Sequence, residues 1–460
     1  MKYKANYFLF LFVLFSIVSS ASGREVAVNS TEGLKAYLKE AKAGDTIYVY
    51  DGDYKGGFSI NASGTSTQPI TIIAENTGKA RFLDFIRLNG THIVLSGFYF
   101  AEKGGLYVAG QNCRITRCTM NNIEHAKWLQ LSSRSQQIEI DYCLFENKEN
   151  NKRLTKNCQV LQVNTNGSNE RHHIHHNHFR NIPKGISSGS YETIQLISSD
   201  NPADPKAYTR NIVEYNLFEN CDGDSEIISV RSNGNILRYN TFRDSAGELV
   251  LRQGDDNHVE GNFFFGTKTK GIRLQGAGQV IVNNYFYNTR KAVSFMDGTQ
   301  DKAYARVERA KVMHNTIVNC SLGMSIGLND SKYPNQGGYE PKECLIANNI
   351  FKVSGQVLTF ENGDKPEGWI WKNNIFSGRL GAQEIDGLTS ADPMLTRTGK
   401  ELFLPSTKTP AAKPHYAQDI LGVKRILNSK LGAFELSGEL NKNAPLTETN
   451  TGPAAKQMQQ

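Results

Sequence analysis

Three arginines and two carboxylates occur where they could act together. Arg231, Arg252 and Arg273 lie in three strand-like segments, IISVR, LVLRQ and IRL, at intervals of 21 residues. If these segments stack, the guanidinium groups lie one above another roughly 5 Å apart, and they repel one another unless an anion lies across them. Asp224 and Glu226 are two residues apart, so both carboxylates can point the same way on a strand. The combination predicts a cleft for a polyanionic chain and a divalent cation.

The alternative is that these carboxylates form salt bridges with the arginines on a solvated sheet face. That alternative suffices for any single pair, but an arginine column beside a carboxylate pair on adjacent coils favours a function. The net charge of +7 is small for 460 residues. The prediction therefore depends on the local arrangement and not on the overall charge.

These segments belong to a repeat of two short strands. In the clearest copies, such as LVLRQ with NHVEGNFF, an alternating apolar strand is followed by a second strand that ends in Asn or Cys and then an aromatic residue. The small residue recurs at intervals of 22 to 39 residues, at Cys118, Cys143, Asn177, Asn216, Asn240, Asn262, Asn284, Asn315, Asn349 and Asn374. A shortest interval of 22 residues, with longer intervals elsewhere, is typical of a solenoid whose coils carry loops of different length.

The repeat predicts an all-β, single-domain, right-handed parallel β-helix of about ten or more coils. Alternating residues such as Leu249 and Leu251 place one side of each strand in a buried interior, and one coil cannot bury that side alone. An Asn at each corner can hydrogen-bond to the Asn above and below it. Propeller blades and leucine-rich repeats do not fit coils of this length. A short helix over Thr31–Ala43, with Thr31 as N-cap, is expected to cover the first coil.

The two ends of the chain differ from the repeat. Residues 1–23 combine Lys2 and Lys4 with an apolar run and the small residues SSASG, which predicts a secretory signal. We therefore expect a periplasmic or secreted protein without a membrane anchor. The predicted β-helix domain covers 24–436, and the polar segment 437–460 is predicted to be disordered. The seven cysteines are predicted to be mostly buried thiols with at most one disulfide.

Several motifs resemble polysaccharide lyase family 6, which contains alginate lyases and chondroitinase B. The resemblance is carried by CDGDSEIISVRSNGNILRYNTFRDSAGELVLRQGDDNHVEGNFFFG, and by PITIIAEN, HAKWLQLSS, YETIQL, GIRLQGAGQVIVNNYF, ADPML and LGAFE. It implies β-elimination on a uronic acid: the carboxylate is neutralised, a base removes the C5 proton, and an acid protonates the departing O4.

The family's catalytic positions are only partly kept. The resemblance implies Arg252 as the acid or its helper, and it implies a base at Arg231, where the family has Lys. It implies Ca²⁺ ligands at Asp224 and Glu226, whereas Gly189 stands where the family has an Asn ligand three residues before Glu192. Whether Ca²⁺ is required stays open at this point. Gln253 replaces the family's His and is a candidate substrate-binding residue.

Three interpretations of the base position follow. Arg231 could act as the base, although a guanidinium is almost always protonated; Tyr191 or a histidine could replace it; or the protein could only bind the glycan. Lys127 and Arg134 could extend the positive groove as substrate-binding residues, with Tyr191 and Arg273.

In the cluster RHHIHHNHF, His173 and His175 share one strand face, but a packing role is favoured. We expect an anionic polysaccharide partner, alginate first and dermatan sulfate second, no nucleic acid, and a monomer.

Overall fold

The computed structural model describes residues 23–167, 169–187, 189–198, 206–300, 304–328, 338–361, 366–436, 440–441 and 443–456. Except for Gly23, the predicted signal segment 1–23 lies outside these residues. Within the described part of the chain, no helix has the length and apolar character needed to cross a membrane.

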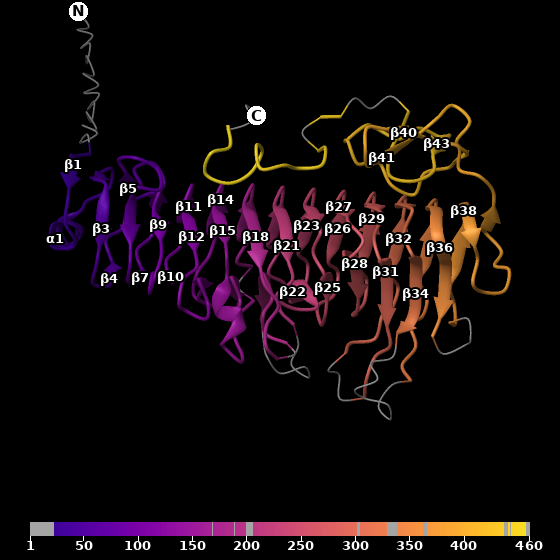
Figure 1. Ribbon diagram of the computed structural model, residues 1–460, viewed down its shortest axis with the longest axis horizontal. Helices are drawn as coiled ribbons and strands as arrows, with labels where there is room; N and C mark the ends of the chain where they lie inside the picture. Colours follow the sequence, from indigo (N-terminus) through magenta and orange to yellow (C-terminus); the bar gives the residue numbers. More distant parts are fainter. Residues whose placement is uncertain are drawn as a thin grey trace, which may run out of the picture.

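The chain winds into a parallel β-helix whose coils follow one another along a single axis (Figure 1). A 14-stranded sheet and a 25-stranded sheet make up the coils, and the 25-stranded sheet consists of two series of strands. The β-helix therefore has three faces, named here A, B and C. The fold class predicted from the repeat is confirmed.

Face A is the 14-stranded sheet and consists of β1 (Glu25–Val28), β2 (Thr46–Val49), β5 (Ile70–Ala74), β8 (Ile93–Ser96), β11 (Arg114–Thr116), β14 (Glu139–Asp141), β17 (His173–His175), β20 (Ile212–Glu214), β23 (Ile236–Arg238), β26 (His258–Glu260), β29 (Val280–Val282), β32 (Lys311–Met313), β35 (Leu345–Ala347) and β37 (Ile370–Lys372). Face B consists of β3 (Gly52–Tyr54), β6 (Ala80–Phe82), β9 (Tyr99–Phe100), β12 (Thr119–Asn121), β15 (Leu144–Glu146), β18 (His178–Ile182), β21 (Leu217–Cys221), β24 (Thr241–Arg243), β27 (Phe263–Phe265), β30 (Tyr285–Tyr287), β33 (Thr316–Val318), β36 (Ile350–Phe360), β38 (Asn374–Arg379) and β39 (Leu388–Ser390). Face C, which the end of β36 also joins, consists of β4 (Phe58–Ile60), β7 (Phe85–Leu88), β10 (Gly105–Val108), β13 (Leu129–Leu131), β16 (Leu161–Asn164), β19 (Ile194–Ile197), β22 (Glu226–Arg231), β25 (Glu248–Leu251), β28 (Lys270–Leu274), β31 (Lys291–Met296) and β34 (Leu322–Leu328). The remaining elements are α1 (Thr31–Glu40), the 3-10 helix η1 (Glu149–Lys152), β40 (Leu395–Thr398), β41 (Leu402–Pro405), β42 (Ala411–Ala412) and β43 (Ser429–Lys430).

The corner between faces A and B contains the predicted asparagine ladder. From Asn177 to Asn349, each ladder Asn donates from Nδ2 to the Oδ1 of the ladder Asn on the next coil, at 2.9–3.0 Å, and Asn374 is the last acceptor. The residue before each ladder position has the backbone conformation that makes the turn: His176, Tyr215 and Tyr239, for example, have φ between 52° and 55°. The ladder side chains thus satisfy buried polar groups at a corner, while their neighbours adopt the left-handed conformation.

Stacked phenylalanines fill the interior beside this ladder. Their ring centroids are 4.7–5.0 Å apart from coil to coil, over Phe145, Phe179, Phe218, Phe242, Phe264 and Phe286. All seven cysteines are buried and unbridged, so the predicted buried thiols are confirmed and no disulfide is formed.

We expect Asn262→Ala to lower the free energy of unfolding by about 3 kcal/mol. The backbone N–H and the Nδ2 of Asn240 both donate to Asn262 Oδ1, and a buried donor left without a partner costs about 1–3 kcal/mol. Urea unfolding followed by circular dichroism measures the change. Asn76→Ala is the control because Asn76 is exposed and its side chain bonds to the exposed Asp51, at 3.2–3.3 Å. Equal unfolding midpoints for the two variants would contradict the ladder's role.

Helix α1 covers the first coil as predicted, but its bounds and its cap differ from the prediction. It ends at Glu40 instead of Ala43, and Ser30, not Thr31, is the N-cap; its Oγ accepts the backbone N–H of Gly33 at 3.1 Å. Leu34 and Leu38 are buried, as their one-turn spacing indicates.

The predicted disorder of 437–460 is wrong for residues 443–456. This segment runs back along the coils and is yellow in Figure 1. The backbone N–H of Leu446 donates to Thr241 Oγ1 at 2.9 Å, and the side chain of Leu446 is buried. The segment is therefore packed against the β-helix at this point.

Two further hydrogen bonds hold the same segment closer to its end. The backbone N–H of Gly452 donates to the carbonyl of His176 at 2.9 Å, and Arg117 Nη1 donates to the carbonyl of Pro453 at 2.6 Å. These contacts lie at the corner between faces A and B. The polar composition of the segment concealed the packing because its backbone, rather than its side chains, makes these hydrogen bonds.

Candidate active site

One cavity of about 660 Å³ opens where the turns that follow face B lead into face C. Its walls come from the turn after β18, the turn after β21, the strands β22 and β28, and single residues of neighbouring coils. It is lined by Lys184, Ser187, Gly189, Ser190, Glu192, Asp222, Gly223, Asp224, Ser225, Glu226, Arg231, Ala246, Arg252, Lys270, Arg273 and Tyr304. The three arginines and both carboxylates predicted from the sequence therefore meet in one place.

The arginines do not form the single column that was predicted. Val230 pairs with Leu251, so that Arg231 and Arg252 follow at equivalent positions on adjacent coils. Arg273 pairs instead with Val250, two residues earlier along the strand. Because side chains two residues apart on a strand share a face, Arg273 still points into the same cavity, but it lies beside the other two arginines and not above them.

Glu226 holds two of the guanidinium groups together. Its Oε1 is 2.6 Å from Arg252 Nη1 and 2.6 Å from Arg273 Nη2, and the residue is only 3% exposed. Burial by itself would raise the pKa of Glu226, but the charges of Arg252, Arg273 and Arg231 outweigh burial and lower that pKa. Glu226 is therefore ionised at neutral pH, and it fixes the position of both guanidinium groups.

Glu192 holds the third arginine. Its Oε1 lies 3.2 Å from Arg231 Nη2 and accepts a hydrogen bond from Gln195 at 3.1 Å, while its Oε2 accepts one from Gln159 at 2.9 Å. Burial and the nearby negative charge of Glu226 raise the pKa of Glu192 despite the ion pair with Arg231. Both oxygens of Glu192 are thus occupied by donors of this chain.

The donors around the predicted metal position do not fit Ca²⁺. Asp224 lies in the turn before β22, where its carboxylate accepts the backbone N–H of Tyr191 at 3.1 Å and that of Ser225 at 2.6 Å. Glu226 bonds to two arginines through Oε1 and keeps only Oε2 without a hydrogen-bond partner, and Gly189 offers no side-chain ligand. Ca²⁺ requires about six to eight oxygen ligands. Asp224, Glu226 and Gly189 leave too few free oxygen ligands for this ion.

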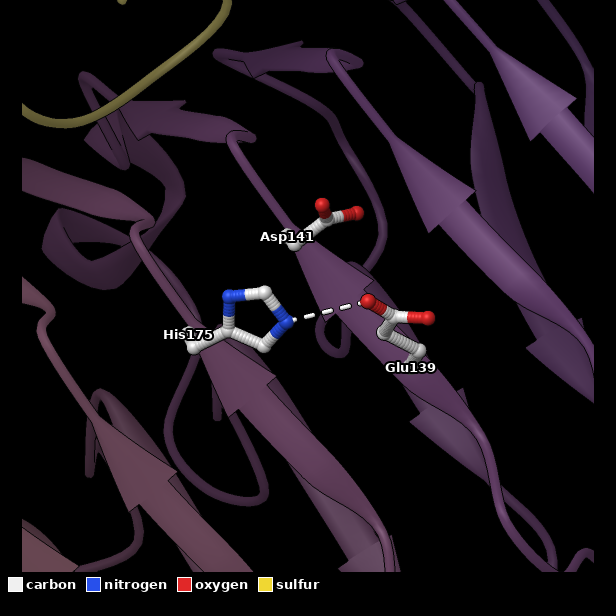
Figure 2. Close-up of side chains that lie close together, drawn as sticks. All are labelled: Glu139, Asp141 and His175. Carbon is white, nitrogen blue, oxygen red and sulfur yellow. Dashed lines mark hydrogen bonds and ion pairs between the residues drawn. The ribbon is translucent and has the colours of Figure 1, made fainter. Parts of the chain in front are cut away.

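A separate group of potential ligands lies on face A. Figure 2 shows Glu139 and Asp141 of β14 beside His175 of β17, with a dashed line at the 3.1 Å contact between His175 Nε2 and Glu139 Oε1. The guanidinium of Arg114 already pairs with Asp141, with Nε 3.0 Å from Oδ1. His173 forms a 2.8 Å contact with Glu214 on the same face. None of these residues lines the cavity.

Four predicted site residues do not line the cavity either: Tyr191, Gln253, Lys127 and Arg134. The hydroxyl of Tyr191 donates to the carbonyl of Leu154 at 2.6 Å, and its side chain is buried, so the structure does not support Tyr191 as a base.

The lining residues that sequence analysis missed include Lys184, Lys270 and Tyr304. The ring of Tyr304 packs under Arg252, with the guanidinium carbon 5.2 Å from the ring centroid. Lys270 is three residues before Arg273 in the same segment, a signal that could have been used. Tyr304 lies in a long connection between β31 and β32 with no repeat pattern, so nothing in its local sequence indicated it.

Known proteins resemble this chain in sequence and in fold. The family model described as chondroitinase B matches residues 28–419. The alginate lyase AlyGC of the PL6 family superposes with a TM-score of 0.74 at 25% identity over 84% of this chain, although the chain spans only 55% of the length of AlyGC. A mannuronic acid-specific family 6 lyase from human gut microbiota gives a TM-score of 0.66 at 24% identity, covering 80% of this chain and 91% of that one.

A PL6 alginate lyase complex with trisaccharide shares the fold at a TM-score of 0.74 and 19% identity, over 95% of this chain and 96% of that one. No curated protein sequence matches the chain. The family model covers most of the β-helix, including the strands that carry the cavity. The chain therefore belongs to the chondroitinase B family, polysaccharide lyase family 6.

Proposed function

We propose that the protein is a lyase that cleaves a uronic-acid-containing anionic polysaccharide by β-elimination. The observation that carries the proposal is the convergence of Arg231, Arg252 and Arg273 in one cavity on the outside of the β-helix. Two buried carboxylates hold these guanidinium groups in place. A fixed group of cations in an open cavity is complementary to the carboxylates of an acidic sugar polymer.

The chemistry follows from where charge develops during β-elimination. Removal of the proton at C5 places negative charge in the uronate carboxylate, and cleavage of the C4–O4 bond places charge on the departing oxygen. Preorganised guanidinium groups stabilise both charges without the cost of reorganising water. In this arrangement Arg231 and Arg273 bind the carboxylate, and Arg252 assists protonation of O4.

Alginate is the first candidate substrate, because the similar structures include alginate lyases and a mannuronic acid-specific lyase. Dermatan sulfate is the second, because the matching family model is that of chondroitinase B. The signal pattern of residues 1–23 supports action outside the cytoplasm. A protein that binds acidic glycans without cleaving them is the alternative from a different functional class, and the change to arginine at position 231 favours it.

The test is incubation of the purified protein with alginate, polymannuronate, polyguluronate and dermatan sulfate. A lyase releases an unsaturated uronate end, and its ultraviolet absorbance grows with time. Growth with one polymer identifies the substrate class. Binding of a polymer without any growth in absorbance would overturn the lyase proposal in favour of the binding protein.

We expect a chelator to leave this activity unchanged. Of the two carboxylates that would hold Ca²⁺, Glu226 already binds Arg252 and Arg273, and Asp224 accepts two backbone N–H groups. In this proposal the guanidinium groups of the cavity therefore neutralise the substrate carboxylate in the place of a metal ion. Initial rates are compared with excess EDTA and with added Ca²⁺, and thermal unfolding is compared under the same conditions because a bound ion stabilises the folded state. A loss of rate in EDTA that Ca²⁺ restores, or a Ca²⁺-dependent rise in Tm, would contradict this expectation.

A further inference from the structure

We propose that Lys270 is the general base that removes the C5 proton, an assignment that rests on the lyase function proposed above. Lys270 is the first residue of β28, and it lines the cavity together with Arg252 and Arg273. It lies three residues before Arg273 on the same strand. A polymer that contacts the guanidinium groups would therefore also lie beside the Lys270 amine.

The Lys270 amine is available for proton transfer. Among the residues that the structure describes, it donates no hydrogen bond and forms no ion pair, although it is half-buried. The next lysine along the stack is different: Lys291, which pairs with Lys270 in the strand register, forms a 3.2 Å ion pair with Glu248 and does not line the cavity. The carboxylate of Glu248 thus already forms ion pairs with Lys291, at 3.2 Å, and with Arg273, at 3.5 Å.

The surroundings of Lys270 favour its neutral form. Burial lowers the pKa of Lys270 from its usual value of 10.5, and the positive charges of Lys291, Arg290 and Arg273 lower it further, while Glu248 acts in the opposite direction. A base must be unprotonated to accept a proton, and a lysine among cations reaches that state at a lower pH than an exposed lysine.

Several other ionisable groups of the cavity are less suited to this role, and Lys184 is exposed where Lys270 is half-buried. Arg231 carries a guanidinium, a side-chain type that is a poor proton acceptor, and it forms a 3.2 Å ion pair with Glu192. Glu192 accepts hydrogen bonds through both oxygens, and Glu226 bonds to two arginines. Tyr304 packs its ring under Arg252. Tyr304 is the strongest competitor, and the experiment below includes it.

The proposed step is balanced without a co-reactant. The neutral Nζ of Lys270 forms a bond to the C5 proton, and the C5–H electron pair becomes the C4=C5 double bond. The C4–O4 bond breaks with its electrons on O4, which takes a proton from a water molecule that hydrogen-bonds to Arg252. Lys270 then returns its extra proton to water, so the products are an unsaturated uronate and an alcohol.

The substitution that tests the assignment is Lys270→Arg, because it keeps the positive charge and removes the accessible neutral form. We expect kcat/KM to fall by about 10²–10⁴-fold, the usual contribution of a general base. In the wild-type protein, kcat/KM should rise with pH as the Lys270 amine loses its proton, and this rise should disappear in the variant. In Lys270→Ala, a small primary amine added to the buffer should restore part of the rate. Lys291→Arg, on the adjacent coil outside the cavity, is the matched control and should retain the wild-type rate and pH profile.

Each outcome decides the assignment. Loss of rate in Lys270→Arg with an unchanged Tm, together with amine rescue of Lys270→Ala, supports it. If the wild type is active and Lys270→Arg keeps the rate and the pH profile, the assignment of Lys270 as the base is overturned, while the lyase proposal stands. Position 270 then needs only a positive charge. If the rise of kcat/KM with pH disappears in Tyr304→Phe but persists in Lys270→Arg, the assignment of Lys270 is overturned and Tyr304 is the base. A wild type inactive on every polymer overturns the lyase proposal and this assignment with it.

Discussion

Arg252→Ala is expected to lower kcat/KM on the substrate polymer by about 10²–10³-fold while the protein stays folded. The magnitude is that of removing one preorganised group that stabilises developing charge. Arg252 lies in the cavity between the carboxylate of Glu226 and the ring of Tyr304, so its guanidinium is held in one position before the substrate binds. The fold should persist because Arg273 still neutralises Glu226. Initial rates of absorbance growth and thermal unfolding measure the two quantities.

Two further variants interpret the result for Arg252→Ala. Arg252→Lys tests whether the positive charge alone is enough, and Arg309→Ala tests whether the loss of any arginine lowers the rate. Arg252→Lys keeps the positive charge but loses the planar fork of donors, and we expect a rate between those of the wild type and Arg252→Ala. Arg309→Ala is the control, because Arg309 is 58% exposed and pairs with Glu308 outside the cavity. Near-normal activity in Arg252→Ala would contradict the assignment of the cavity as the active site.

Glu226→Gln is expected to have the largest effect on stability, a loss of about 3–5 kcal/mol, and to reduce activity as well. Removing one partner of a buried ion pair leaves an uncompensated charge in the interior, and Glu226 is the partner of both Arg252 and Arg273. Without Glu226, the two guanidinium groups repel each other and lose their fixed positions. Urea unfolding measures the stability, and the rate of product formation measures the activity.

The effect of Glu226→Gln should depend on pH. The pKa of Glu226 is lowered in the folded protein, so its stabilising contribution is fully present above the ordinary glutamate pKa of about 4.3. The contribution is lost as the pH falls through the lower pKa of the folded state. The difference in stability between the wild type and the variant should therefore shrink in acid.

Glu149→Gln is the control for Glu226→Gln. Glu149 is 49% exposed and pairs with Lys152 at the surface, and an exposed pair of this kind contributes about 0–1 kcal/mol. Equal stability of Glu226→Gln and Glu149→Gln, or a pH-independent difference between the wild type and Glu226→Gln, would contradict the central role of Glu226.

The sequence alone determined the fold, because a solenoid is built from contacts between neighbouring coils. The positions from Asn177 to Asn374 recur in the sequence and form a continuous hydrogen-bonded ladder in the structure. The alternation of Leu249 and Leu251 placed both side chains in the interior. Motif resemblance also located Arg252, Glu226 and Arg231 in what proved to be one cavity.

Only the tertiary structure decided how the charges of the cavity are paired. The sequence aligned Arg273 with Arg252, but the strand register moves it by two residues and brings it to Glu226. The partners of Glu192 lie on other coils, and Tyr304 enters the cavity from an irregular connection. Periodic sequence patterns specify which side of a strand is buried, and so they fix the β-helix. They do not specify which of several nearby cations a buried carboxylate binds, because register, side-chain reach and loop path set that choice in three dimensions.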